Sequence, residues 1–374
     1  MFFINILKKN VKNYLQNKKL KKLIAIIKKS SYFDEAFYRK TYNIPKNVDC
    51  AEHYLTKGYL CGYNLSPEFD SIKYENYYKL FFKNNGNPLI RFEQDHKSIE
   101  DKHDISFPSN CIEIERKFAL QKPKHKRVAI FASFSNDGKI HDDVIFYLKG
   151  LKEIVDNIIL IGDNPVFEDE ISKIRDLVYF CKFIKHNEYD FGSYKIGYRF
   201  LKENNLLKDV DELLFCNDSC IGPIFPFSEV IEQAKPIKCD FWGLTSSTTI
   251  CFHIQSYFFV LRNSVIKSNV MDSFFSYVKP QESPENIIFY YEMKLTQFLE
   301  FHNFDGFAVY KRYGIQNLHE DYELISNPLE FMLNYRMPLV KKKVLDKDSE
   351  YGKSAKYIKK TKDYIKSIQP KLIY

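Results

Sequence analysis

The chain has 374 residues, of which 45% are hydrophobic and 16% aromatic, so it can bury a large core and is not a disordered protein. Its formal net charge of +8 is unevenly spread: residues 1–30 hold nine lysines and no acid, residues 341–374 carry +7, and residues 31–340 therefore carry −8. Because the basic residues gather at the two ends, we predict no nucleic-acid groove in the acidic body.

Residues 1–30 predict a basic amphipathic helix, because lysines alternate there with large apolar side chains. Such a helix could lie on an anionic membrane surface or dock onto the core of the protein. No apolar run approaches the roughly 20 residues of a spanning helix, and no export cleavage site follows. The eight cysteines lack zinc-ligand spacing. We therefore expect a cytoplasmic protein, peripheral on the inner face of the cytoplasmic membrane.

Residues 31–85 predict a small helical module. The motif at Phe33–Tyr38 recurs weakly at Phe69–Tyr74, and aromatic side chains stand at helical spacing between the two copies. We interpret these aromatics as the core of the module. Residues 86–125 are polar and lack periodicity, which predicts a linker with short elements.

Residues 126–340 alternate apolar runs with amphipathic segments. Strands are predicted at 127–132, 157–162, 178–183, 212–217, 240–243, 253–261 and 307–310. Helices are predicted from about 142, at 168–177, after the loop at 187, at 227–234 and at 291–299. This alternation predicts an α/β domain with a mainly parallel sheet and flanking helices. Residues 341–374 predict a basic, partly helical C-terminal tail.

Three common nucleotide or hydrolase motifs are missing from the sequence. There is no G-x-G-x-x-G after the first predicted strand, no G-x-x-x-x-G-K-[ST] and no G-x-S-x-G. A dinucleotide dehydrogenase, a P-loop enzyme and an α/β-hydrolase are therefore disfavoured.

The most informative strand runs from 212 to 217 and ends in Asn217 and Asp218, with Gly222 and Pro223 just beyond. Ligands of α/β proteins bind at the carboxyl ends of such strands. A carboxylate there is suited to a divalent cation, because hard cations take oxygen ligands. The alternative is that Asp218 only caps the next turn.

Further motifs follow one another along residues 127–345. They are Asp142-Asp143-Val144, Tyr189-Asp190-Phe191-Gly192-Ser193-Tyr194-Lys195, Asn217-Asp218-Ser219, Asp240-Phe241-Trp242-Gly243, His253-Ile254-Gln255-Ser256 and Tyr291-Glu292. In this order they resemble the rhamnan synthesis protein F family of bacterial polysaccharide glycosyltransferases. Two positions depart from the family: Glu188 stands where a glycine is usual, and Ser133-Phe134 replaces a common His-Tyr pair. Both departures leave the preferred base and sugar open.

The resemblance implies a GT-A-like fold and transfer of a sugar from a nucleotide-sugar donor to a surface polysaccharide or lipid-linked glycan. Rhamnose transfer from dTDP-rhamnose is the leading candidate. The resemblance further implies an inverting reaction assisted by Mn²⁺ or Mg²⁺.

The candidate site residues divide by role. Asp218 is the metal ligand, and donor binding falls to Asn187, Asp190, Lys195, Asn217 and Ser219. Glu292 is the catalytic base with Asp240 as the second choice, and His253, Gln255 and Trp242 contact acceptor or diphosphate. Each has a structural alternative. Asp190 could hold its helix, Glu292 could complement a helix dipole, His253 could be a satisfied strand residue and Trp242 could fill the core.

Two other functions are compatible with the sequence. One is a non-catalytic scaffold that binds a sugar nucleotide or glycan. It is favoured because this sequence resembles the Asp-x-Asp motif of better-known GT-A transferases only at its last carboxylate, Asp218, and lacks the first. The other is a membrane-tethered interaction protein that acts through its ends and residues 31–85. Donor turnover would separate both from an enzyme.

Overall fold

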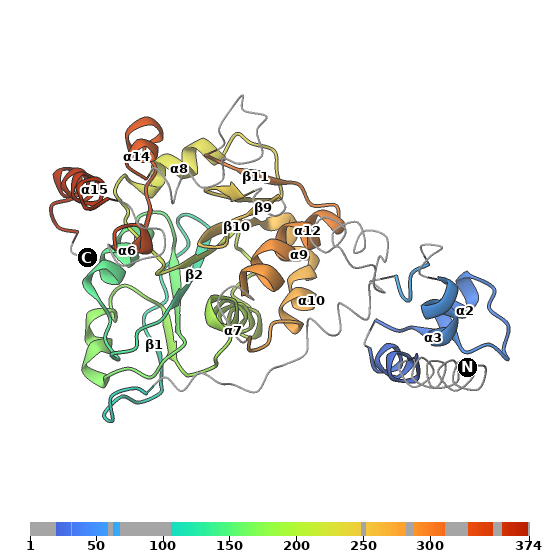
Figure 1. Cartoon of the computed structure of the whole chain (residues 1–374). Helices are drawn as coiled ribbons and strands as arrows, with labels where there is room; N and C mark the ends of the chain where they lie inside the picture. Colours follow the sequence, from blue (N-terminus) through green and yellow to red (C-terminus); the bar gives the residue numbers. More distant parts are fainter. Residues whose placement is uncertain are drawn as a thin grey trace, which may run out of the picture. The chain divides into compact units, whose positions relative to one another are not determined.

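The computed structural model (Figure 1) forms two compact units, Met1–Lys97 and Ser98–Tyr374. The residues that it describes are 20–30, 32–58, 63–67, 106–247, 252–281, 287–310, 328–346 and 354–372. Residues 1–19 of the predicted basic helix, the second aromatic motif at Phe69–Tyr74 and most of the predicted linker lie outside them.

The described part of the first unit is helical around a small aromatic core. Residues 20–29 are helical, followed by α2 (Glu35–Thr41), α3 (Cys50–His53) and the π-helix η1 (Tyr54–Gly58). Asp34 begins α2 by accepting a hydrogen bond from the backbone N–H of Phe37. Ile27 is fully buried against Tyr38, so the helical residues 20–29 dock onto this core, as the second interpretation of the segment predicts.

The second unit is built on one eight-stranded sheet. Its strands are β1 (Ile114–Lys117), β2 (Arg127–Ser133), β3 (Asn157–Gly162), β4 (Phe180–Phe183), β5 (Glu212–Asn217), β7 (Phe241–Gly243), β10 (Phe258–Arg262) and β11 (Gly306–Ala308). They lie in the order β1-β4-β3-β2-β5-β10-β7-β11, and only β1 and β10 run antiparallel to their neighbours. The predicted fold class, a mainly parallel α/β sheet with flanking helices, is confirmed.

Helices cover both faces of this sheet. They are α6 (Asp142–Lys152), α7 (Tyr189–Glu203), α8 (Phe227–Ala234), α9 (Asn263–Ser268), α10 (Val270–Ser276), α12 (Met293–Phe301), α14 (Pro328–Tyr335) and α15 (Ala355–Ile368), with the short helices η3 (Glu168–Lys173), η4 (Ile288–Glu292) and η5 (Lys342–Val344). Along β2, Ala129 and Phe131 pack on the face of α6 and α8, whereas Val128 and Ile130 pack on the face of α7, α9, α10 and α12. Continuous apolar strands follow from this double coverage.

The segment predicted as a linker contains an edge strand. In β1, Ile114 is buried and pairs with Phe183 of β4, while the next three residues, all charged, are exposed. Exposed charges are typical of an edge strand, since they discourage pairing with another chain. Their polarity is what made the segment resemble a linker.

The strand predicted over 253–261 is two strands, β9 (His253–Ile254) and β10. The backbone groups of Ser256 leave the ladder at the break: its N–H donates to Glu292 at 2.7 Å and its carbonyl accepts from the Tyr194 hydroxyl at 3.0 Å. Side chains far away in the sequence thus replace the ladder bonds, which no local pattern reveals. β9 pairs instead with β8 (Ser246–Ser247).

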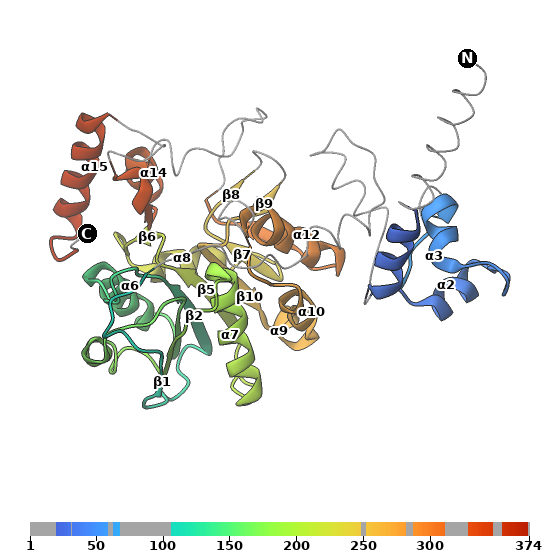
Figure 2. The same cartoon turned by 60° about the horizontal axis from the view of Figure 1, so that its bottom comes forward.

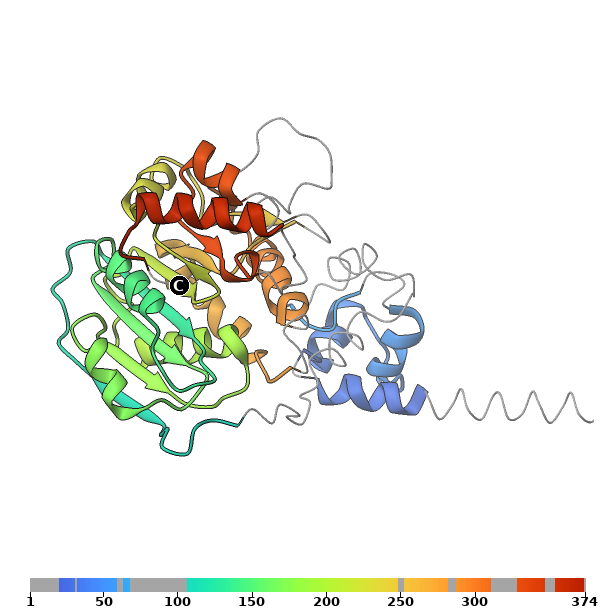
Figure 3. The ribbon, with the colours of Figure 1, turned by 60° about the vertical axis from the view of Figure 1, so that its left-hand side comes forward.

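The basic residues 341–374 are part of the second unit and not an appended tail. β12 (Val340–Lys341) pairs antiparallel with β6 (Cys220–Ile221), directly after β5. Helix α15 buries Ile358 and Ile365, and it lies beside α14 on the side of the sheet that carries α6 (Figures 2 and 3). Among the described residues, no helix has the length and apolar character that a membrane span needs.

Candidate functional site

The carboxyl ends of β2, β3 and β5 lie at one rim of the sheet. Ala132 of β2 is opposite Asn217 of β5, and Ser133 is opposite Gly162 of β3. Polar side chains begin where these apolar strands end, which is the usual place for a ligand site in an open α/β sheet.

A chain of hydrogen bonds starts at this rim on Asp190, in the first turn of α7. Asn217 donates from Nδ2 to Asp190 at 2.9 Å and accepts at Oδ1 from the Ser219 hydroxyl at 2.6 Å. Lys341 of β12 donates to the same hydroxyl at 2.9 Å. Three segments distant in sequence therefore meet around Asn217.

The ammonium group of Lys341 also lies 4.2 Å from the centre of the Tyr257 ring, a cation–π contact. The Tyr257 hydroxyl is 2.7 Å from the Thr245 hydroxyl, which in turn donates to Gln255 at 2.7 Å. Gln255 thus belongs to the same polar network, through Thr245 and Tyr257.

Glu292 is a fixed anion behind this network. Its carboxylate accepts from the N–H and the hydroxyl of Ser256, and His253 Nε2 lies 3.5 Å away. Burial by itself raises the pKa of Glu292, but the hydrogen bond and charge of His253, the charge of Lys341 and the Ser256 hydrogen bond bring the pKa down to about 2. Glu292 is therefore ionised and a weak base.

Asp190 has the opposite shift. Burial and the nearby negative charge of Glu292 raise the pKa of Asp190 to about 6, against the hydrogen bond from Asn217 and the charge of Lys341. Two carboxyl groups in one site whose pKa values are pushed apart are suited to different tasks. By this criterion Asp190 is the better proton acceptor.

Asp218 lies just beyond Asn217, in the turn between β5 and β6. Its Oδ2 accepts from the Ser133 hydroxyl at 3.0 Å and from the N–H of Phe134 at 2.8 Å. Burial raises the pKa of Asp218, while the positive charge of Lys342 lowers it. Lys342 itself forms a 2.6 Å ion pair with Asp143.

These contacts do not fit a metal held by the protein. Asp218 offers a single carboxylate, whose Oδ2 already accepts two hydrogen bonds and on which the positive charge of Lys342 acts. A Mg²⁺ or Mn²⁺ ion there would need diphosphate oxygens and water to complete its coordination. Within the part of the chain that the structure describes, no three His, Cys, Asp or Glu side chains come together as a ligand set.

The contacts of Asn187 and Lys195 stabilise the loop before α7. Asp163, at the end of β3, accepts from the N–H groups of His186 and Asn187 at 2.8 Å each and from that of Tyr189 at 3.1 Å. Lys195 forms a half-buried ion pair with Glu188 and donates to the Val278 carbonyl at 3.0 Å. The sequence prediction placed Lys195 on the donor, but the structure directs it to the loop and to the segment after α10.

Asp240 and Trp242 lie away from the rim described above. β7 runs parallel to β5, so Asp240 precedes its strand at the opposite rim, where it accepts from Ser264 and from the N–H of Asp305. The five residue steps of β5 separate the two rims by roughly 16 Å. Trp242 is fully buried, and its indole donates to Glu212. The second choice of base and the sugar-stacking interpretation of Trp242 are therefore not supported.

The structure brings together most of the predicted site residues: Asp190, Asn217, Asp218, Ser219, His253, Gln255 and Glu292. Sequence reasoning missed Lys341, Lys342 and Ser256 as members of the site. The only signal for the lysines was a Leu339-Val340 pair before them, which is too short to predict a strand.

The chain matches the model of the family described as Rhamnan synthesis protein F over residues 158–371. It is similar to the virulence protein VirA of Vibrio anguillarum, with 30% identity over 155 residues, 40% of this chain and 47% of that protein. The chain spans about half the length of the curated relatives that it matches.

Two solved structures match the chain with low TM-scores. A cytidylyltransferase from Leptospira borgpetersenii is 13% identical, with a TM-score of 0.32 over 67% of this chain and 100% of that chain. Core-mannan synthase A from Aspergillus fumigatus, in an Mn/GDP form, is 10% identical, with a TM-score of 0.29 over 49% of this chain and 73% of that chain.

Proposed function

Since the chain belongs to the rhamnan synthesis protein F family, we propose that it is a glycosyltransferase. The proposed donor is a nucleoside diphosphate sugar, with dTDP-rhamnose first among the candidates because of the rhamnan in the family description. The proposed acceptor is a growing surface polysaccharide or a lipid-linked glycan. Work at the inner membrane face is part of the proposal, and flotation with anionic vesicles would test it.

The observation that carries the proposal is the placement of Lys341 at the turn after β5. A sugar leaves from its nucleotide as the diphosphate gains negative charge, so the site must offer fixed positive charge or N–H donors there. Lys341, hydrogen bonded to Ser219, offers an ammonium group at the rim, and Lys342 lies on the other side of the same turn.

In an inverting transfer, a base takes the proton from the acceptor hydroxyl as the bond to the sugar forms. We assign this role to Asp190 in place of Glu292, because a pKa of about 6 is close to working pH, whereas a pKa of about 2 leaves little basicity. Glu292 keeps Ser256 and His253 in position behind it. The proposal gives no step to a metal, and a Mn²⁺ or Mg²⁺ ion bound through Asp218 and the donor diphosphate stays a prediction, which donor binding with EDTA and with Mn²⁺ tests.

Calorimetry with dTDP-, UDP- and GDP-sugars, each with EDTA and with Mn²⁺, tests the donor. We expect one of them to bind in the micromolar range and to be hydrolysed slowly when no acceptor is present. Binding without any hydrolysis or transfer would instead indicate the non-catalytic scaffold. Absence of binding to every nucleotide sugar under both conditions would refute the proposed function.

A further inference from the structure

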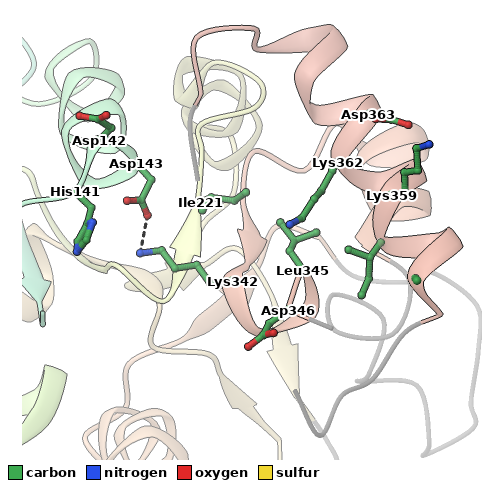
Figure 4. Close-up of a pocket in the computed structure, with 12 residues that line it drawn as sticks. His141, Asp142, Asp143, Ile221, Lys342, Leu345, Asp346, Lys359, Lys362 and Asp363 are labelled. Carbon is green, nitrogen blue, oxygen red and sulfur yellow. Dashed lines mark ion pairs between the residues drawn. The ribbon is translucent and has the colours of Figure 1, made fainter. Parts of the chain in front are cut away.

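A second hollow, lined by charged and apolar side chains, opens on the other side of the turn that carries Asp218. A cavity of about 990 Å³ lies between the start of α6, the β6 strand, η5 and helix α15 (Figure 4). Its polar lining consists of His141, Asp142, Asp143, Asp346, Asp363, Lys342, Lys359 and Lys362. This size is at the upper end of the roughly 300–1,000 Å³ of small-molecule sites, so an extended ligand fits it better than a single sugar.

The charges of the lining favour a neutral ligand over a polyanion. Four aspartates outnumber three lysines, so a nucleotide or a free diphosphate would meet net negative charge. Carboxylates accept and ammonium groups donate, which together suit a ligand whose hydroxyls do both. Ile221, Leu345, Ala355 and Ile358 add an apolar part to the lining that can contact the C–H groups of sugar rings.

The cavity meets the donor turn at the ion pair of Asp143 and Lys342 (Figure 4). The backbone N–H of Lys342 donates to the Ser219 carbonyl at 2.9 Å, which attaches this side of the cavity to the turn. Lys342 and Asp143 also both act electrostatically on Asp218. A ligand in the cavity can therefore extend to the place where the donor sugar would be held.

We propose that this cavity binds the acceptor, a neutral oligosaccharide whose reacting end extends past the Asp143–Lys342 pair to the donor turn. The proposal rests on the proposed function for the meaning of "acceptor", but the binding of a glycan in the cavity is independent of turnover. Helix α15 is then the wall that sets how long a glycan the protein accepts.

Two lysines of α15 give a matched pair of variants. The Lys362 side chain lines the cavity and extends from α15 toward η5, whereas Lys360, two residues away, does not line it (Figure 4). Lys362→Trp and Lys360→Trp remove the same charge and add the same indole on the same helix. Only the first should fill the cavity.

Binding is measured by calorimetry or by ligand-observed NMR with a series of neutral rhamnose oligosaccharides of two to six units, and with inorganic pyrophosphate. We expect the oligosaccharides to bind the wild type and the Lys360→Trp variant with similar Kd, and the Lys362→Trp variant at least tenfold more weakly. Nucleotide-sugar binding should be equal in all three proteins, which also shows that each is folded.

Equal weakening by both tryptophans, or no glycan binding by the wild type, would overturn the proposal. Binding of pyrophosphate in place of glycan, sensitive only to Lys362→Trp, would overturn it as well and would assign the cavity to an anion. If glycan binding is lost only in Lys362→Trp while no donor is ever turned over, the cavity proposal stands and the proposed transferase activity fails.

Discussion

Asp190 and Glu292 show how neighbouring residues of one type acquire different chemistry. Ser256 and His253 both stabilise the ionised carboxylate of Glu292, whereas Asp190 receives one side-chain hydrogen bond and the repulsion of Glu292. The charge of Lys341 lowers the pKa of both groups. The sequence alone favoured Glu292 as the base because of its position near a helix start. Only the three-dimensional surroundings reverse the order of the two pKa values.

Replacing the proposed base should separate chemistry from binding. We expect Asp190→Asn to lower kcat by at least about 100-fold, the usual size of a general-base contribution, with little change in donor Kd. In the wild type, kcat should fall as the pH drops below about 6, where Asp190 becomes protonated. Single-turnover rates over pH 4.5–8.5 give the profile. If Glu292→Gln lowers kcat more than Asp190→Asn does, and Asp190→Asn keeps the pH dependence of the wild type, the role of base returns to Glu292.

The depressed pKa of Glu292 predicts a pH-dependent stability. Its pKa falls from an ordinary 4.5 to about 2 on folding, so the stability that it contributes is present above about pH 4.5 and is lost as the pH falls toward 2. The wild type should therefore exceed Glu292→Gln in Tm at pH 7, and the gap should narrow steadily between pH 4.5 and pH 3. Calorimetric scans of both proteins measure it, and a constant gap would contradict the prediction.

Lys341→Met should weaken donor binding. Loss of one charge-assisted hydrogen bond of about 1.5–3 kcal/mol corresponds to a Kd roughly 10- to 100-fold higher. Lys238→Met, an exposed lysine just before Asp240 at the opposite rim, removes the same charge and serves as the control. Calorimetry with the donor compares the two. Equal Kd values for both variants would remove Lys341 from the donor site.

At the scale of elements, the loop before α7 depends on one carboxylate. Asp163 gathers three backbone N–H groups of residues 186–189, and Asn187 and Tyr189 adopt positive φ values of 59° and 54° there. The conformation of this loop thus depends on Asp163, a residue that directly follows β3 and lies more than 20 positions earlier in the sequence. The family's usual glycine is replaced by Glu188, and Glu188 pairs with Lys195.

We expect Asp163→Ala to destabilise the second unit strongly. Three N–H groups lose their acceptor at about 1 kcal/mol or more each, which corresponds to a Tm lower by roughly 10 °C. Asp163→Asn keeps one acceptor oxygen, so its Tm should lie between the Tm of Asp163→Ala and that of the wild type. The exposed Asp169→Ala is the control for removal of a charge. If the Tm of Asp163→Ala lies within about a degree of the Tm of that control, the conformation of the loop does not depend on Asp163.

Elements with strong local signals could be predicted from the sequence. The apolar runs of β2, β3 and β5 and the polar residues that end β5 were enough for the sheet and for Asn217 and Asp218. The contribution of β12 was not predictable, because its pairing with β6 joins residues about 120 positions apart and spans only two residues. The role of Trp242 was ambiguous, because an aromatic side chain can stack on a sugar or pack in the core. Trp242 is fully buried, which places it in the core.

At the scale of the whole molecule, each unit has its own core. We expect a fragment of residues 98–374 to fold and to bind the donor as the full chain does, because the described residues of this unit form large apolar clusters of their own. Removing residues 354–374 from that fragment should expose the cluster around Ile365 and lower stability by several kcal/mol, since each buried aliphatic side chain contributes about 1.5–3 kcal/mol. Urea unfolding followed by circular dichroism compares the fragments. Equal midpoints would show that α15 contributes no stability.

The pairing of β6 with β12 also has a consequence in time. The nascent chain leaves the ribosome from its amino end at about 5–20 residues per second, so every strand of the large sheet is synthesised before Lys341 emerges. Until then the turn after β5 has its carboxylate and amide but neither lysine. A partly synthesised protein can therefore build the scaffold of the site without the cations that we assign to the donor, and competence to bind arrives as a late event of biosynthesis.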